Sequence, residues 1–199
     1  MEQNTTPRED AAIDADLGER IKALRTRLKL TIEDLAARSG VSRAMISKIE
    51  RGESSATAQL LGRLCAALGV TLSTLFARPA KGASPVSRRA EQRVWQDPGS
   101  GYVRRAVSPP VTDGVVELVE VVLPPGAIVP FERQHLTGVD QLIWILEGAL
   151  DMSIGSQTHA LQTGDCLHMR FEEPMTFRNA STAPVRYAVV LAHGRSTAR

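Results

Sequence analysis

The spacing of hydrophobic residues changes character near residue 78. Between residues 17 and 76, apolar side chains recur at every third or fourth position, as on one face of a helix; the first set is Leu17, Ile21, Leu24 and Leu28. From about residue 94 they form short β-branched runs, broken by Pro, Gly and Asp, at 115–122, 142–146 and 185–191. Residues 78–93 contain Pro, Gly, Ala and Ser without any periodicity. The pattern predicts a multidomain α-then-β chain, with an all-α domain at 17–77, a linker at 78–93 and an all-β domain at 94–199.

Side chains typical of helix ends divide the first domain into five short helices. The first helix is expected at residues 17–29. Four hydroxyl residues have the chemistry of N-caps for the helices that follow: Thr31, Ser42, Thr57 and Thr71. Gly40 and Gly52 are typical of helix C-termini and end the second and third helices. Because only a few residues around Gly40 connect these two helices, the pair has the form of a helix-turn-helix.

The third helix has two chemically different faces. Met45, Ile46 and Ile49 are expected to point toward the core. The opposite face carries polar and small residues, namely Arg43, Ala44, Ser47, Lys48 and Arg51. A helix that reads DNA needs such a face, because guanine is recognised by a forked donor, close approach requires small residues, and phosphates attract cations.

The sequence of this region resembles the Cro/C1-type (XRE) helix-turn-helix domains of phage-repressor-like regulators. The resemblance rests on TIEDLA at 31–36, GVS at 40–42, ISKIERG at 46–52 and the closing segment 68–76. It implies a five-helix, lambda-repressor-like DNA-binding domain. It further implies roles for individual residues: base edges face Arg43, Ala44, Ser47 and Lys48, the phosphate backbone lies beside Thr31 and Ser42, and Arg25 forms a buried ion pair with Glu50. The alternative is a helix-turn-helix that serves only for packing.

Charge is distributed unevenly along the chain. Residues 17–53 carry nine Lys or Arg against five acids and residues 54–93 carry six against one, whereas residues 94–199 carry eight against eleven. This asymmetry favours a polyanionic partner for the first half only. Residues 1–16, with one Arg and five acids, are expected to form a disordered N-terminal tail.

Several global features indicate a cytoplasmic protein. No run of apolar residues reaches the ~18 that a membrane span needs, and the N-terminus lacks the apolar segment of a secretory signal. Cys65 and Cys166 lie far apart within apolar runs, so both are expected to be buried thiols in a reducing compartment.

The β-rich half resembles the cupin family. Pro125 and Gly126 followed by QLIWILEG at 141–148 resemble the first cupin motif, and Gly164-Asp165 followed by PMTFRN at 174–179 resembles the second. The resemblance implies a cupin β-barrel of the jelly-roll type. It covers roughly residues 115–192.

The chain departs from the metal-binding cupins at the ligand positions. Where those proteins carry His, His, Glu and His, this sequence has Glu132, Gln134, Gln141 and Met175. Because Gln and Met are poor ligands for zinc, manganese or iron, we expect no metal and no other cofactor. His135 and His168 lie close to the motifs and would rebuild a metal site only if the loop at 132–140 were shifted. Without a metal, the barrel interior is expected to be a small-molecule pocket lined by Glu132, Gln134, Gln141, Met175 and Phe177.

These features together predict a sequence-specific DNA-binding transcriptional regulator, a repressor, that acts as a homodimer on double-stranded operator DNA. Its cupin domain is expected to dimerise and to bind a small-molecule effector without metal, and no catalytic residues are expected. A short recognition helix reads only a few base pairs, so two copies on a two-fold axis multiply specificity. Two alternatives stay open: a metal-dependent cupin enzyme that carries a helix-turn-helix-like domain, and a constitutive repressor whose cupin is purely structural.

Overall fold

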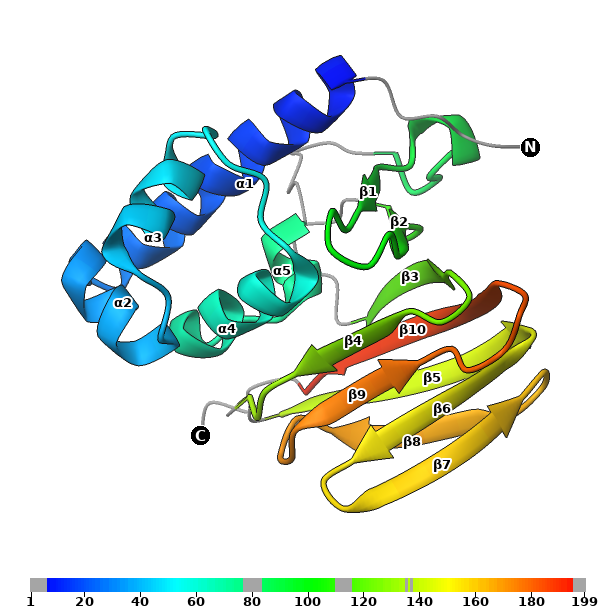
Figure 1. The fold of residues 1–199 in the computed structure, drawn as a ribbon. Coiled ribbons are helices and arrows are strands. Elements are labelled where there is room, and N and C mark those ends of the chain that lie inside the picture. Colours follow the sequence, from blue (N-terminus) through cyan, green and yellow to red (C-terminus); the bar gives the residue numbers. More distant parts are fainter. Residues whose placement is uncertain (1–6, 77–83, 110–115, 135, 137, 195–199) are drawn as a thin grey trace.

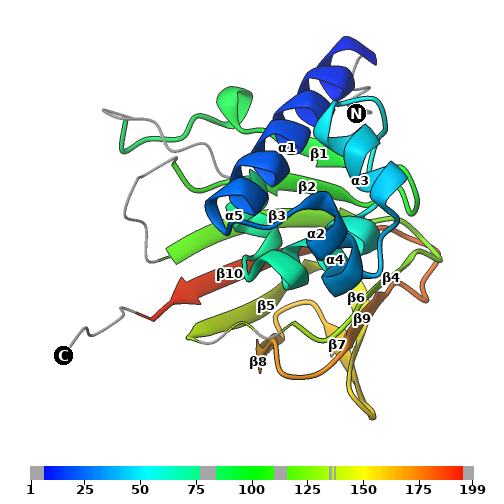
Figure 2. The ribbon, with the colours of Figure 1, turned by 90° about the vertical axis from the view of Figure 1, so that its left-hand side faces the viewer.

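The computed structural model describes residues 7–76, 84–109, 116–134, 136 and 138–194, with side chains from residue 12 onward. In these ranges, five α-helices precede a β-rich half: α1 (Pro7–Arg27), α2 (Ile32–Ser39), α3 (Arg43–Glu50), α4 (Ala58–Leu68) and α5 (Leu72–Phe76). A short 3-10 helix, η1 (Arg89–Glu91), lies in the connection between the halves. None of the helices described is long and apolar enough to cross a membrane. The helices gather on one side of the β-sheets (Figures 1 and 2).

The first helix corrects the prediction of a disordered tail at residues 1–16. Helix α1 begins at Pro7, ten residues before the expected start; residues 1–6 lie outside the described part of the chain. The added turns have tertiary partners, because Ile13 packs against the core, Asp14 accepts a hydrogen bond from Ser55, and Asp16 pairs with Arg93, the residue before β1. A composition that favours disorder in isolation is therefore ordered here by long-range contacts.

Within the described ranges, ten strands form two antiparallel sheets. Neighbouring strands of the six-stranded sheet follow the order β1 (Val94–Gln96), β2 (Val103–Ala106), β3 (Val116–Leu123), β10 (Val185–His193), β5 (Val139–Glu147) and β8 (Cys166–Arg170). The four-stranded sheet runs β4 (Ile128–Phe131), β9 (Met175–Arg178), β6 (Ala149–Ile154) and β7 (Gln157–Gln162). The two sheets face each other (Figure 1).

The strands alternate between the inside and the outside of the sandwich. Along β5, Gln141, Ile143 and Ile145 are buried, whereas Leu142 and Trp144 between them are exposed. This two-residue period is what one face packed on a core requires. The observed architecture confirms the predicted α-then-β fold with a cupin barrel.

The two cysteines differ in environment. Cys65 in α4 is fully buried, and burial raises the pKa of its thiol to about 12. Cys166 at the start of β8 is exposed, contrary to expectation. It lies at the edge of the six-stranded sheet, opposite Trp144 on the outer face.

The helical and β-rich halves dock directly onto each other. Asp97, just after β1, accepts a hydrogen bond from the backbone N–H of Ala58 at 2.7 Å and so caps the N-terminus of α4. Phe76 of α5 packs on Trp95 of β1, with ring centroids 5.1 Å apart. Gly62 of α4 lies so close to Phe131 that an added Cβ would stand 2.6 Å from the ring. The predicted linker is thus not the sole connection, because buried residues of both halves form one core.

Candidate DNA-binding face and barrel pocket

Local hydrogen bonds shape the helix-turn-helix. Thr31 and Asp34 form a capping box at α2: the Thr31 hydroxyl accepts from the Asp34 backbone N–H at 3.0 Å, and the Asp34 carboxylate accepts from the Thr31 backbone N–H at 2.8 Å. The bond from the Thr31 backbone N–H to this carboxylate, and a second from the Thr31 hydroxyl at 2.7 Å, lower the pKa of Asp34. Gly40 ends α2 with φ +66°, a left-handed conformation that glycine adopts without strain. The Ser42 hydroxyl then accepts from the Met45 N–H at 3.2 Å and begins α3.

The outer face of α3 is open to solvent over most of its residues. Ile46 and Ile49 are buried, while Met45 is half-buried. On the other side, Ser47 is half-buried and the remaining candidates are exposed, namely Thr31, Ser42, Arg43, Ala44, Lys48 and Arg51. The predicted DNA-contacting residues are therefore accessible to solvent, Ser47 in part.

The cations on this surface differ in their partners. Arg43 forms an ion pair with Glu33 of α2, and both side chains are about two-thirds exposed. The Arg51 guanidinium donates to Glu53 at 2.6 and 2.7 Å and also to the Ser47 hydroxyl. Such exposed pairs contribute little stability, so a phosphate or a base can replace the carboxylate at small cost.

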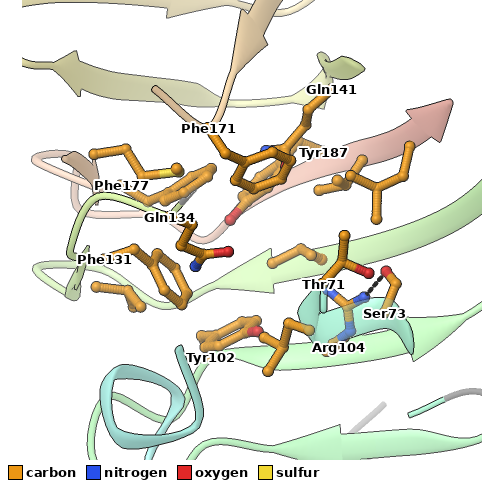
Figure 3. A pocket seen from close by; sticks show the side chains of 16 residues that line it. Thr71, Ser73, Tyr102, Arg104, Phe131, Gln134, Gln141, Phe171, Phe177 and Tyr187 are labelled. Carbon is orange, nitrogen blue, oxygen red and sulfur yellow. Dashed lines mark hydrogen bonds between the residues drawn. The ribbon is translucent and has the colours of Figure 1, made fainter. Parts of the chain in front are cut away.

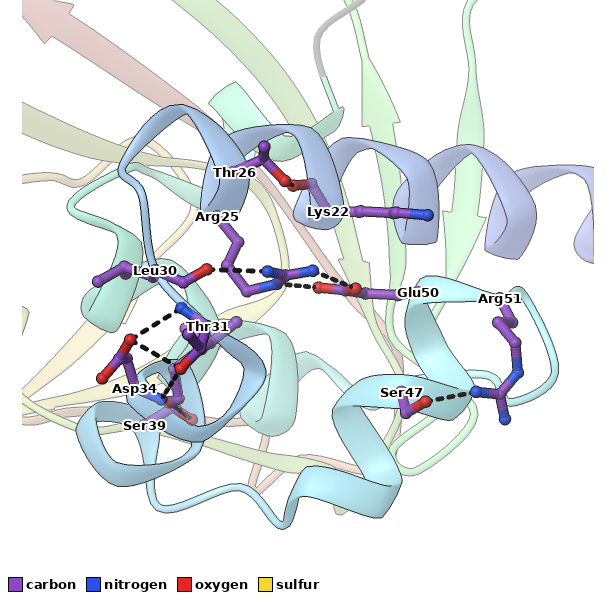
Figure 4. A network of polar contacts seen from close by, with 11 residues as sticks. Lys22, Arg25, Thr26, Leu30, Thr31, Asp34, Ser39, Ser47, Glu50 and Arg51 are labelled. Atoms are coloured by element: carbon purple, nitrogen blue, oxygen red, sulfur yellow. Dashed lines mark hydrogen bonds and ion pairs between the residues drawn. The ribbon is translucent and has the colours of Figure 1, made fainter.

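A buried ion pair holds α3 against α1 (Figure 4). Nε and Nη2 of Arg25 donate to the two carboxylate oxygens of Glu50 at 2.6 and 2.8 Å, and Nη1 donates to the Leu30 carbonyl at 2.8 Å. The bond to Glu50 raises the pKa of Arg25. This geometry confirms the pair implied by the family resemblance. It also shows the Leu30 carbonyl as an acceptor for Arg25, which no sequence pattern indicates.

A cavity of about 60 Å³ lies inside the barrel mouth, beneath α5 (Figure 3). Four of the five predicted pocket residues line it, namely Gln134, Gln141, Met175 and Phe177, and all four are buried. Glu132 is the exception: it is exposed and does not line the cavity. Val129 and Phe131 of β4 line the cavity, so Glu132, which is out of phase with them, lies on the opposite side of the chain.

The polar groups of the cavity are incompletely satisfied. The buried Oε1 of Gln134 has no hydrogen-bond partner among the described residues. The Gln141 amide contacts only a weak acceptor, because its Nε2 lies 3.8 Å from the Met169 sulfur. Buried polar atoms without partners are uncommon in native structures and indicate a place for a water or a ligand.

Other cavity residues are missed by sequence reasoning. Thr71, Leu72 and Ser73 come from α5 and its N-terminus, and Tyr102 and Arg104 come from β2 and the residue before it. In VRRA at 103–106, both faces of the strand carry an arginine, so alternation alone does not reveal which one is buried. The one sequence signal is Tyr102 before the strand: it is largely apolar and lies two residues from Arg104, so it indicates that Arg104 shares the inward face.

His168, which was considered for a rebuilt metal site, does not line the cavity. His168 is exposed on β8, where its Nε2 lies 2.9 Å from the Asp140 carboxylate. His135 lies outside the described residues. Across the ranges that the structure covers, no group of three or more His, Cys, Asp and Glu side chains is placed to hold an ion.

Comparisons with known proteins match both halves. A helix-turn-helix family model matches residues 21–75, and a cupin domain model matches residues 119–191. The HTH-type transcriptional regulator SutR of Escherichia coli is 26% identical over 176 residues, which cover 88% of this chain and 94% of that protein. The chain is a helix-turn-helix transcriptional regulator of the XRE type with a C-terminal cupin domain.

Solved structures place this XRE-type regulator among proteins of the same architecture. The crystal structure of an HTH_3 family transcriptional regulator from Vibrio cholerae superposes with a TM-score of 0.74 at 26% identity and covers 94% of this chain and 99% of that chain. Hydroxypropylphosphonic acid epoxidase from S. wedmorenis is more distant, with a TM-score of 0.47 at 17% identity over 90% of this chain and 98% of that chain. That likeness is too weak to bear on function.

Proposed function

We propose that this regulator represses transcription by binding operator DNA as a homodimer through α3, and that its cupin barrel binds a small-molecule effector without metal. The observation that carries the DNA-binding role is the uncovered outer face of α3, with Arg43 and Lys48 exposed while Ile46 and Ile49 are buried. Arg43 then reads a base edge, Lys48 contacts a phosphate, and Thr31 and Ser42 lie beside the backbone.

Fluorescence anisotropy of a labelled duplex from upstream of the protein's own gene tests the DNA-binding role. Wild type is expected to bind tightly and more weakly as salt rises. Lys48→Ala is expected to lower the affinity for all sequences and to make the affinity less dependent on salt concentration. Arg43→Ala is expected to relax the sequence preference. Arg178→Ala, an exposed arginine on β9, is the matched control. Unchanged affinity in the Arg43→Ala/Lys48→Ala variant would refute the assignment of the reading face.

The outer face of the six-stranded sheet supports the homodimer. Trp144 on β5 is 49% exposed and Leu142 beside it is 37% exposed. Val190 of β10 lies opposite Leu142, and Leu118 of β3 lies opposite Val190, so an apolar row crosses three strands. We assign this row to a second copy of the chain, because a two-fold axis pairs a self-complementary patch with itself and also brings two recognition helices onto one duplex.

Sedimentation equilibrium tests the dimer. Trp144→Arg is expected to shift the protein toward the monomer and to weaken operator binding. Ile128→Arg is the matched control, because Ile128 is 53% exposed on β4 of the other sheet. Equal association by both variants and wild type would exclude this face as the dimer interface.

The cavity beneath α5 supports the effector role. Its walls combine apolar side chains with the amides of Gln134 and Gln141, which is the composition of a small-molecule site. Thermal-shift screening is expected to find compounds that stabilise wild type but not Gln141→Leu or Phe177→Leu. Stabilisation that survives both substitutions would place the ligand elsewhere.

A reporter gene under the cognate promoter tests the repressor role. Deletion of the regulator is expected to raise reporter expression; a fall in expression would indicate an activator.

A further inference from the structure

The cavity contains a buried cation without a counter-charge. Arg104 of β2 is only 7% exposed and lines the cavity. Its Nη2 donates to the Ser73 hydroxyl, and its guanidinium lies over the Phe76 ring, 5.6 Å from the centroid. Within the ranges described, no carboxylate pairs with Arg104. Since burying an unpaired charge is costly, such an arginine is typical of a site that receives an anion.

The other polar groups that line the cavity are neutral. Burial raises the pKa of both Tyr102 and Tyr187, so their hydroxyls stay protonated at neutral pH and can donate to an anion. Asp97, which is buried close by, accepts from Ala58 and Ser100 instead. The cavity thus presents one fixed positive charge and several neutral donors.

A second observation points to the other end of the ligand. The unpartnered Oε1 of Gln134 is a buried acceptor in the same cavity as Arg104. Figure 3 shows the Gln134 amide pointing into the space among the aromatic rings, with Arg104 on the side nearer α5. A ligand that satisfies both groups needs an anionic end and a hydrogen-bond donor, joined by a short apolar body.

We propose that the effector is a small carboxylic acid whose carboxylate pairs with Arg104 and whose hydroxyl or amino group donates to Gln134. This inference rests on the proposed effector role of the same cavity. A planar carboxylate matches the forked donors of a guanidinium, and a volume of about 60 Å³ suits a molecule of only a few carbon atoms.

The same arginine links the cavity to the DNA-binding domain. Ser73 and Phe76, which contact Arg104, both belong to α5. Helix α5 in turn receives a hydrogen bond from Arg20 of α1 at the Thr74 carbonyl, at 3.0 Å. A carboxylate that engages Arg104 competes with Ser73, so its binding changes how firmly α5 is held to the barrel. Because binding free energies are linked, ligand and operator then alter each other's affinity by the same factor.

Fluorescence of Trp95 provides the binding assay. Trp95 packs on Phe76 and Tyr102, and Trp144→Phe removes the only other tryptophan. The probes are lactate, propionate and propionamide at constant ionic strength, which separate the donor and the charge. Lactate is expected to bind more tightly than propionate, and propionamide is expected to give no response.

Two variants test the role of the charge. Arg104→Met is expected to weaken lactate binding at least about tenfold, because breaking a desolvated charge pair costs more than that. Arg105→Met removes the same charge one residue away, on the opposite face of β2, and is expected to leave binding unchanged. Equal binding of lactate and propionamide, no response to either carboxylate, or full binding by Arg104→Met would overturn the inference. Operator binding by the same preparation would then still uphold the regulator.

Hydrogen exchange tests the link to α5 without any operator. Lactate is expected to change the exchange rates of the α5 amides in wild type and to change them less in Ser73→Ala, which keeps Arg104 and the cavity. Identical changes in both proteins would refute the coupling through Ser73.

Discussion

Removal of the Arg25 guanidinium is the most direct test of how the recognition helix is held. In Arg25→Met, the Glu50 carboxylate loses two charge-assisted hydrogen bonds of 2.6 and 2.8 Å, and the Leu30 carbonyl loses its donor. The Glu50 side chain is only 6% exposed, so water replaces these partners poorly. Leaving one member of a buried pair uncompensated costs about 3–5 kcal/mol, which is a large part of the stability of a small domain.

Urea denaturation of the full chain, followed by circular dichroism at 222 nm, measures this loss. The double variant Arg25→Met/Glu50→Leu is expected to recover most of it, because two apolar side chains of similar size leave no charge stranded. Arg43→Met, which breaks the exposed pair with Glu33, is the matched control and is expected to change stability by less than about 1 kcal/mol. A loss below about 1 kcal/mol in Arg25→Met, or no recovery in the double variant, would refute this reasoning.

Three further predictions concern docking and capping. Asp97→Ala removes the acceptor for the N-terminus of α4 and is expected to cost about 1–3 kcal/mol in the same urea assay, whereas Asp97→Asn should retain part of it. Gly62→Val is expected to cost at least about 1–3 kcal/mol because its side chain meets Phe131, and Phe131→Ala should relieve the clash; no rescue would place the strain elsewhere. The lowered pKa of Asp34 means that its bonds to Thr31 stabilise the fold above the ordinary Asp pKa near 3.8 and lose this effect as pH falls through the lowered value. Thermal melts between pH 2 and 6 should therefore show a weaker acid dependence in Asp34→Asn than in wild type.

Sequence reasoning predicted the pocket in part. Gln134, Gln141, Met175 and Phe177 were placed through their positions in two cupin motifs, and the structure brings them together. Glu132 failed because the cavity-lining residues of β4 are Val129 and Phe131, and the residue after Phe131 is out of phase with them. A motif gives the order of positions along the chain, but the phase of the strand decides on which side a side chain lies.

The sequence by itself determined the local architecture of this protein. Helix ends at Thr31, Gly40 and Ser42 follow from interactions between residues two to four positions apart, and the change of hydrophobic period from helix to strand marks the two halves. These features depend on the chemistry of near neighbours, so they can be read directly along the chain.

Only the tertiary structure decided which distant residues share a site. It extended α1 to Pro7, where Ile13, Asp14 and Asp16 have distant partners, and it placed α5 over the barrel mouth. It also buried Arg104 while its strand neighbour Arg105 took the opposite face. The physical reason is that these outcomes depend on contacts between segments more than 30 residues apart, such as Arg104 with Ser73, and no local pattern encodes which segments will meet.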